Sequence, residues 1–243
     1  MAIKRNYVLG VMMIGAIGQT TIPEIPAPST VVEMHSSQLV NFESSSPGVQ
    51  KVLLSALSLT GMNLKYKYGS ADPSSGGLDC SGTIYYILRK LGIQEVPRQA
   101  SDIYMWVRKN DHFKAVWSTD PKTPELSDLR PGDLLFWVGT YDVNRDPPIT
   151  HVMIYAGIEK TTGKRVMIGS SEGRLYDGKS RYGTSVFDFS LPGYPLPKWA
   201  AITKSRFIGY GKIPGIDSLN PPPVPLTPDN DPEMVPEKKI SLE

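Results

Sequence analysis

The chain has 243 residues, of which 40% are hydrophobic and 21% are charged, and it contains one cysteine and three histidines. This composition is typical of a globular protein with room for one domain and short appendages. A formal net charge of +2 with scattered basic residues gives no reason to expect a nucleic-acid partner. A single cysteine excludes an intrachain disulfide framework and argues against a cysteine-based zinc site. Nothing in the sequence indicates a metal or an organic cofactor.

The N-terminal segment has the pattern of a secretory signal. Lys4 and Arg5 precede an uncharged, mostly apolar run over residues 7–18, which ends in a small-x-small sequence. The run is too short to span a bilayer, which takes roughly 20 apolar residues. We therefore predict a signal peptide over residues 1–18, no stable membrane span, and an exported protein that is either periplasmic or secreted to the cell envelope. A buried or interfacial N-terminal helix is the alternative.

Two segments of biased composition flank the predicted domain. Residues 19–47 are rich in proline, serine and threonine and predict a spacer or wrapping arm. Residues 214–243 hold eight prolines and six acidic residues, which predicts a flexible tail or a ligand for an unidentified partner. The folded domain is therefore expected over residues 48–213.

Within this domain, predicted helices come first and predicted strands later. Apolar spacing indicates helices over residues 48–61, 80–91 and 97–110. Runs bounded by glycine, proline, aspartate and asparagine indicate four strands, over residues 130–139, 150–159, 164–171 and 205–213. Helices followed by a block of antiparallel strands predict an α+β fold.

Two long connections, residues 109–128 and 138–150, lead into these strands. Long loops at such positions can form lids or specificity walls, and neutral surface insertion is the alternative. Four aromatic residues lie on or near them, and we expect most of the four to pack in the core: Trp106, Trp117, Trp137 and Tyr141.

The only cysteine, Cys80, lies in the stretch GGLDCSGTIYYILRKLG over residues 76–92. Apolar residues follow at helical spacing from Ile84 to Leu91, so the helix begins near Cys80, with Asp79 as its N-cap. A thiol in the first turn faces the positive end of the helix dipole, which can lower a cysteine pKa from about 8.5 to roughly 3.5–7.5. The N–H groups of that turn can also form an oxyanion hole. Cys80 is therefore a candidate nucleophile, and a buried structural thiol is the alternative.

A nucleophilic cysteine needs a base, and the chain offers three histidines. His35 lies in the irregular arm and His112 in a polar loop, whereas His151 begins a predicted strand. On that strand it shares a face with Met153 and Tyr155. Because a strand fixes the orientation of the ring, His151 is the best candidate for a general base.

An ordered set of motifs resembles those of the NlpC/P60 cysteine peptidases. In chain order between Tyr66 and Ile213 they read YKYG, GGLDCSG, VPRQASDIY, LRPGDLLFW, THVMIYAG and SRFIGYGKI. The resemblance implies a papain-like α+β core, in which the helix bearing the cysteine at its N-terminus packs on an antiparallel sheet. It also implies hydrolysis of stem peptides of bacterial peptidoglycan, with a favoured bond between γ-D-glutamate and diaminopimelate or lysine.

The same resemblance assigns roles to residues. It makes Cys80 the nucleophile and His151 the base, and it places Tyr66 at the oxyanion hole. Asp79, Ser81 and Arg98 stand where the family has substrate-contacting or site-shaping residues.

The family's third polar residue, most often a histidine that orients the base, has no counterpart in this chain. Gly169 stands at that position. Ser170, Ser171 and Glu172 are candidates after a shift of register, as are a backbone carbonyl or a water molecule, and alternation along the strand favours Ser171. Two other functions stay open: an amidase or acyltransferase of the same fold, and a degenerate module that binds peptidoglycan.

Overall fold

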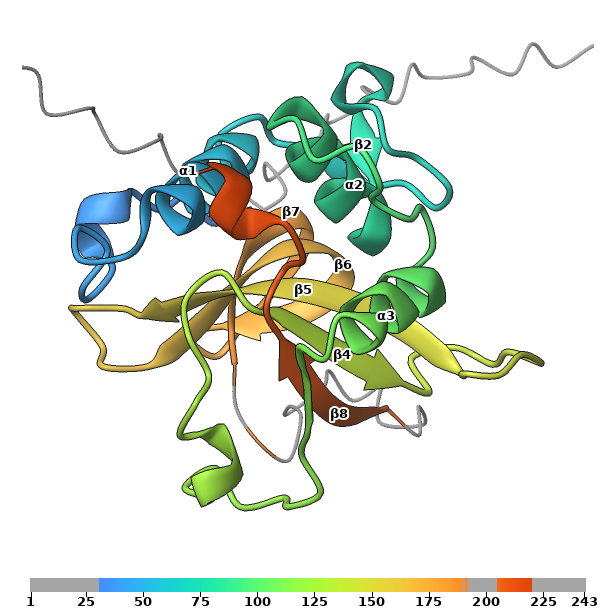
Figure 1. Ribbon diagram of the computed structural model, residues 1–243. Helices are drawn as coiled ribbons and strands as arrows, with labels where there is room; N and C mark the ends of the chain where they lie inside the picture. Colours follow the sequence, from blue (N-terminus) through green and yellow to red (C-terminus); the bar gives the residue numbers. More distant parts are fainter. Residues whose placement is uncertain (1–30, 190, 192–204, 220–243) are drawn as a thin grey trace, which may run out of the picture.

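An antiparallel sheet, with helices on one face, forms most of the computed structural model, which describes residues 31–189, 191 and 205–219 (Figure 1). The helices are α1 (Pro47–Thr60), α2 (Cys80–Lys90) and α3 (Ala100–Lys109). The sheet has the order β3-β8-β4-β5-β6-β7, and every neighbouring pair is antiparallel. Its strands are β3 (Phe113–Ala115), β4 (Leu134–Val138), β5 (Ile149–Ile158), β6 (Arg165–Tyr176), β7 (Lys179–Asp188) and β8 (Arg206–Gly211). The predicted α+β fold is thus confirmed.

The three helices begin and end close to the predicted positions, because their local signals agree with their packing. Ser46 caps α1 by accepting a hydrogen bond from the backbone N–H of Val49, and Pro47 takes the first helical position. Asp79 caps α2 in the same way through the N–H of Gly82. The apolar faces of the helices pack together against β5, β6 and β7.

Alternation along the strands divides the core into two layers. On β5, Val152 and Ile154 face the helices, whereas Met153 and Tyr155 face the opposite side. The connection between α3 and β4 covers that opposite side with buried apolar residues, among them Leu126 in the 3-10 helix η3 (Pro124–Leu126). This connection therefore completes the core.

The four aromatic residues near the connections differ in burial. Trp137 is fully buried, as expected, and Trp106 is half-buried. Trp117 is 77% exposed and Tyr141 is 41% exposed, so the prediction that they pack in the core is wrong for these two. Each lies in a connection, outside the helices and strands.

The sheet contains strands that the apolar pattern did not predict. β7 is absent from the prediction, and β6 runs five residues past its predicted end at 171 to pair with it. Asp177 and Gly178 both have positive φ at the turn between β6 and β7, which is the geometry of a tight hairpin. The short edge strand β3 was also missed.

The packed region extends past both ends of the predicted domain at residues 48–213. Met34, Leu39 and Phe42 of the predicted arm are buried in the helix-side core. The 3-10 helix η5 (Ile216–Leu219), inside the predicted tail, packs on α1. The predicted signal peptide at 1–18 and residues 220–243 lie outside the described residues. Within the described residues, no helix is long and apolar enough to cross a membrane.

Candidate active site

A two-stranded parallel sheet brings Tyr66 close to Cys80. It consists of β1 (Lys65–Tyr66) and β2 (Gly77–Leu78), and it pairs Tyr66 with Leu78, two residues before the cysteine. Burial raises the pKa of Tyr66, and the neighbouring Cys80 and Asp79 raise it further. The Tyr66 hydroxyl is therefore protonated at neutral pH and can donate a hydrogen bond.

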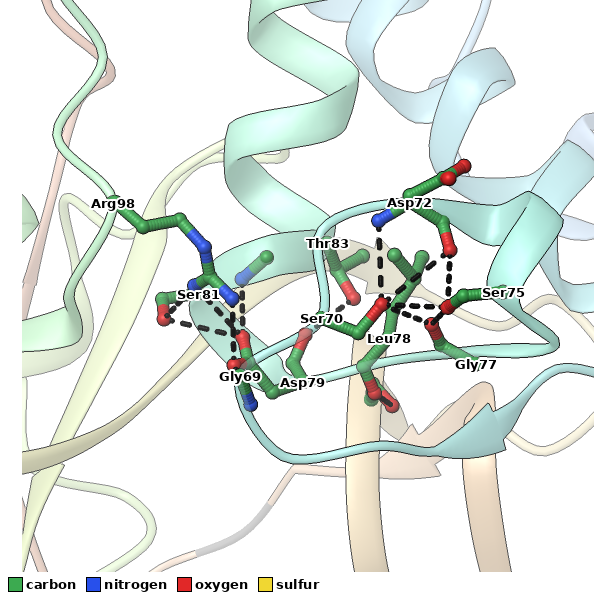
Figure 2. A network of polar contacts seen from close by, with 12 residues as sticks. Gly69, Ser70, Asp72, Ser75, Gly77, Leu78, Asp79, Ser81, Thr83 and Arg98 are labelled. Atoms are coloured by element: carbon green, nitrogen blue, oxygen red, sulfur yellow. Dashed lines mark hydrogen bonds and ion pairs between the residues drawn. The ribbon is translucent and has the colours of Figure 1, made fainter.

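Asp79 is the hub of a polar network at the start of α2, which Figure 2 shows. Its carboxylate accepts hydrogen bonds from the N–H of Gly82 at 2.5 Å and from the N–H of Gly69 at 2.8 Å. Arg98 binds both carboxylate oxygens, at 3.0 and 2.8 Å, and also donates to the Ser81 hydroxyl at 3.0 Å. This fork geometry is the strong form of an arginine–carboxylate pair. One carboxylate thus fixes the helix start, the preceding loop and Arg98.

The loop that precedes the cysteine packs tightly against the first turn of α2. A Cβ atom at Gly82 would lie 2.0 Å from the backbone oxygen of Ser70, so only glycine fits there. The N–H of Asp79 donates to that same oxygen at 3.0 Å. Gly82, two residues after Cys80, therefore allows two backbone segments to approach each other closely.

Cys80 lies where β5 and β6 separate. Their hydrogen-bonded ladder ends at the pair Ile154–Ile168. Beyond that end, the backbone N–H of Val152 on β5 lies near enough to the Cys80 sulfur to lower the thiol pKa. The nucleophile predicted from the sequence is thus held next to the residue that follows His151.

The Cys80 thiol is protonated in this environment. Its side chain is 6% exposed. Burial, followed by the charge of Asp79, raises the thiol pKa to about 11, although the N–H groups of Val152 and Ser81 act in the opposite direction. The prediction of a lowered thiol pKa is therefore wrong, because burial outweighs the helix N-terminus.

His151 is neutral for the same reason. It is 6% exposed on β5, and its ring contacts the edge of Trp137 on β4 at a centroid distance of 5.7 Å. Burial lowers the pKa of His151 well below 6.5, and the nearby Arg174 lowers it further. A neutral imidazole can accept a proton, so His151 keeps the form that a general base requires.

No described side chain takes the place of the family's third residue. The Nε2 atom of His151 is buried and has no hydrogen-bond partner among the described residues. Ser170 donates its hydroxyl to the backbone oxygen of Leu78 at 2.6 Å. Ser171 is buried but makes no hydrogen bond to Nε2, so its predicted role as orienting residue has no contact to support it.

The space next to Gly169 is filled by a neighbouring strand. A Cβ atom at this position would lie 2.6 Å from the sulfur of Met153 on β5. A histidine at 169 would therefore collide with Met153, which shares a face of β5 with His151. The glycine and the methionine occupy the place of the missing side chain together.

Arg174 on β6 is a charged neighbour of Cys80 and His151 that was not predicted from the sequence. Its guanidinium lies 4.5 Å from the centre of the Trp137 ring, and the residue is only 4% exposed. Its charge lowers the pKa of both Cys80 and His151. It was missed because it lies beyond the predicted end of its strand.

A cavity of about 210 Å³ opens beside Cys80. Five of the residues predicted for the site line it, whereas His151 and Ser171 do not. Thr150 lines the cavity as well, so His151 lies between a residue of the wall and Val152, whose N–H lowers the pKa of the thiol. Other lining residues were not predicted for the site, and three of them are the aromatic or cationic Tyr68, Tyr141 and Arg145. The predicted site residues in the wall are Tyr66, Asp79, Cys80, Ser81 and Arg98.

This arrangement, a buried cysteine at the N-terminus of a helix that packs on the strand carrying His151, defines the class of protein. Residues 63–181 match the model of the NlpC/P60 family. This match confirms the resemblance to the NlpC/P60 family found in the motifs of the chain.

Two known proteins show how far the similarity extends. Murein DD-endopeptidase MepH of Escherichia coli (strain K12) is 32% identical over 114 residues, which cover 43% of this chain and 34% of that protein. The chain therefore matches about a third of the length of this relative. A solved structure from Staphylococcus aureus subsp. aureus Mu50, described as similar to a lipoprotein of the NLP/P60 family, is 25% identical. It covers 70% of this chain and 42% of its own, with a TM-score of 0.43.

Proposed function

We propose that this protein is an exported peptidoglycan hydrolase that cleaves stem peptides with Cys80 as nucleophile. The observation that carries the proposal is the position of Cys80, at the wall of a cavity and beside the backbone N–H of Val152, the residue after His151. Membership of the NlpC/P60 family and the murein endopeptidase relative support the choice of substrate.

The protonation states of the pair define the first step. Because the thiol and the imidazole are both neutral, the Cys80 proton passes to His151 as the sulfur attacks the amide carbonyl. The negative oxygen that develops is stabilised by N–H groups at the start of α2 and by the Tyr66 hydroxyl. The imidazolium then protonates the leaving amine, and water attacks the resulting thioester to release the acid and free the thiol.

The bond that we propose lies between γ-D-glutamate and diaminopimelate or lysine. The relative, a murein DD-endopeptidase, favours a second candidate, a DD-endopeptidase reaction on murein. An amidase or acyltransferase reaction would use the same thioester, and a binding module would use the cavity without turnover.

Purified muropeptides separate these functions when they are incubated with the wild type and with Cys80→Ala. We expect the wild type to release fragments with a new diaminopimelate or lysine N-terminus, identified by liquid chromatography and mass spectrometry. Conversion of cross-linked dimers to monomers with intact stems would indicate the DD reaction instead. The cysteine variant should lose at least about 1000-fold in turnover, as expected when a nucleophile is removed.

A pair of histidine variants provides the matched control. His151→Ala should lose activity to a similar degree, whereas His112→Ala, in a polar loop away from the cavity, should stay within about twofold of the wild type. Full turnover by Cys80→Ala would contradict the proposal. Binding of intact muropeptides by the wild type without any product would support the binding module.

A further inference from the structure

The loop between β4 and β5 contributes a cation to the wall of the cavity beside Cys80. Arg145 and Tyr141 of this loop line the cavity together with Cys80. The loop is one of the two long connections in the sequence.

The structure holds the Arg145 guanidinium in place from two sides. Its Nη2 group donates hydrogen bonds to the backbone oxygen of Ile149 and, at 3.3 Å, to the Tyr141 hydroxyl. The guanidinium also lies over the Tyr141 ring, 5.9 Å from its centre. Such anchoring reduces the entropy that the side chain loses when it binds a ligand.

These contacts leave donor capacity unused. Arg145 is half-buried, and its Nε atom is buried without a hydrogen-bond partner among the described residues. Across the same described part of the chain, no carboxylate lies within ion-pair distance of this guanidinium. A partly buried cation that forms no ion pair favours an anionic ligand.

The charges along the cavity wall point the same way. Asp79 is the acidic residue of the wall, and Arg98 already binds both of its oxygens. That pair is neutral as a unit, so Arg145 gives the wall a net positive charge. A substrate that places a carboxylate near the thiol matches this charge.

Stem peptides have such carboxylates on both sides of the bond that we propose is cleaved. A γ-linked glutamate keeps its α-carboxylate free on the acyl side, and diaminopimelate has a free side-chain carboxylate on the amine side. On the basis of the proposed function, we propose that Arg145 is a specificity-determining residue that binds a free carboxylate of the stem peptide beside the scissile bond. Tyr141 positions its guanidinium.

Three synthetic substrates test this inference and distinguish the two carboxylates. The first is L-Ala-γ-D-Glu-diaminopimelate, the second has the glutamyl α-carboxylate as an amide, and the third has lysine in place of diaminopimelate. Each is assayed with the wild type, Arg145→Gln, Arg145→Lys and Arg108→Gln. Arg108 is the matched control, because it is an exposed arginine stacked on Tyr104 at 5.6 Å and does not line the cavity.

We expect Arg145→Gln to lower kcat/KM for the first substrate by about 10- to 100-fold, the range for a lost charged hydrogen bond. The substrate that lacks the bound carboxylate should be cleaved by the wild type and by Arg145→Gln at rates within about threefold of each other. If that substrate is the amide, the glutamyl carboxylate is the ligand; if it is the lysine peptide, the diaminopimelate carboxylate is. Arg145→Lys should keep part of the preference, since it retains the charge but not the fork.

An equal loss on all three substrates would overturn the inference, because it would reduce Arg145 to a residue that holds the loop. Equal cleavage of all three by the wild type would also overturn it. Both outcomes leave the proposed hydrolase intact, since the wild type still turns over. Failure of the wild type to cleave any of the three, with Cys80→Ala indistinguishable from it, would instead remove the proposed function and this inference with it.

Discussion

At the residue scale, the two groups proposed to carry the reaction are both uncharged at neutral pH. A helix N-terminus alone favours a thiolate, and a thiolate would pair with a protonated imidazole. Here burial acts against both charges, since it raises the pKa of Cys80 and lowers that of His151. A neutral pair follows, in which the proton moves during the attack and not before it.

Alkylation with iodoacetamide reports the state of the thiol directly, because Cys80 is the only cysteine in the chain. The thiolate reacts, so the rate for the folded protein should rise with pH toward a midpoint near the thiol pKa of about 11. The urea-unfolded chain should have its midpoint near 8.5. The mass of the intact protein over a series of pH values gives both curves, and a folded-state midpoint below 8 would show that the helix N-terminus prevails.

The same pKa directions set the acid limit of turnover. Because the pKa of His151 is lowered, the imidazole stays neutral to a pH well below 6.5, and the thiol is protonated across this range. The acid limb of kcat/KM should therefore lie below pH 6.5 for muropeptide cleavage. An acid limb at or above 6.5 in the measured profile would contradict a neutral buried base.

At the scale of elements, a side chain of β5 fills the space that a side chain of β6 would otherwise take. Gly169 on β6 lacks a side chain where Met153 on β5 supplies one, and a Cβ atom at 169 would lie 2.6 Å from the methionine sulfur. A histidine at 169 would thus require the Met153 side chain to move from its place on β5. The two positions should respond to substitution as a unit.

A double-mutant cycle tests this coupling. Gly169→His alone should lower the free energy of unfolding by about 1–3 kcal/mol, because it overpacks a filled space. Met153→Gly alone should cost about 2–5 kcal/mol, since it leaves a cavity. In the double variant the imidazole fills that cavity, so the two losses should fall short of their sum by about 1–3 kcal/mol in urea titrations. Strict additivity would mean that the two side chains do not share one space.

Sequence patterns predicted some of these elements and residues but not others. Asp79 and Cys80 were found because an N-cap, a helix start and an apolar period lie within a dozen residues. β7 was missed because Lys179, Arg181 and Gly183 interrupt any apolar run, and pairing with β6 decides its structure. The adjacent Asp177–Gly178 turn was the available signal for that hairpin. The thiol pKa and the place of Arg145 depend on burial and on contacts between distant segments, which no local period encodes.

At the scale of the whole molecule, segments outside the family's matched range complete the core. The match covers residues 63–181, whereas the described structure includes a buried arm before it and β8 with η5 after it. Leu39 of the arm forms a bridge with Glu159 at the end of the β5–β6 hairpin. The proline- and serine-rich composition of the arm concealed the few apolar residues that anchor it.

Leucine substitutions in and beside the arm measure how much it contributes. Leu39→Ala should lower the free energy of unfolding by about 2–5 kcal/mol, since Leu39 is 1% exposed and its removal leaves a cavity. Leu54→Ala on α1, where the side chain is 49% exposed, should change it by no more than about 0.5 kcal/mol. Urea denaturation followed by circular dichroism compares the two, and equal small effects would mean that the arm is a surface appendage.

The N–H group of Val152 that lowers the pKa of the Cys80 thiol belongs to the main chain. Almost any residue can replace Val152 without loss of this N–H group, because every amino acid except proline has a backbone N–H in the chain. Core packing is then the only limit on which residues position 152 tolerates, except that proline also removes the N–H donor. A library of all substitutions at this codon would separate the two limits, since apolar replacements would be graded by volume and proline would stand apart from that trend.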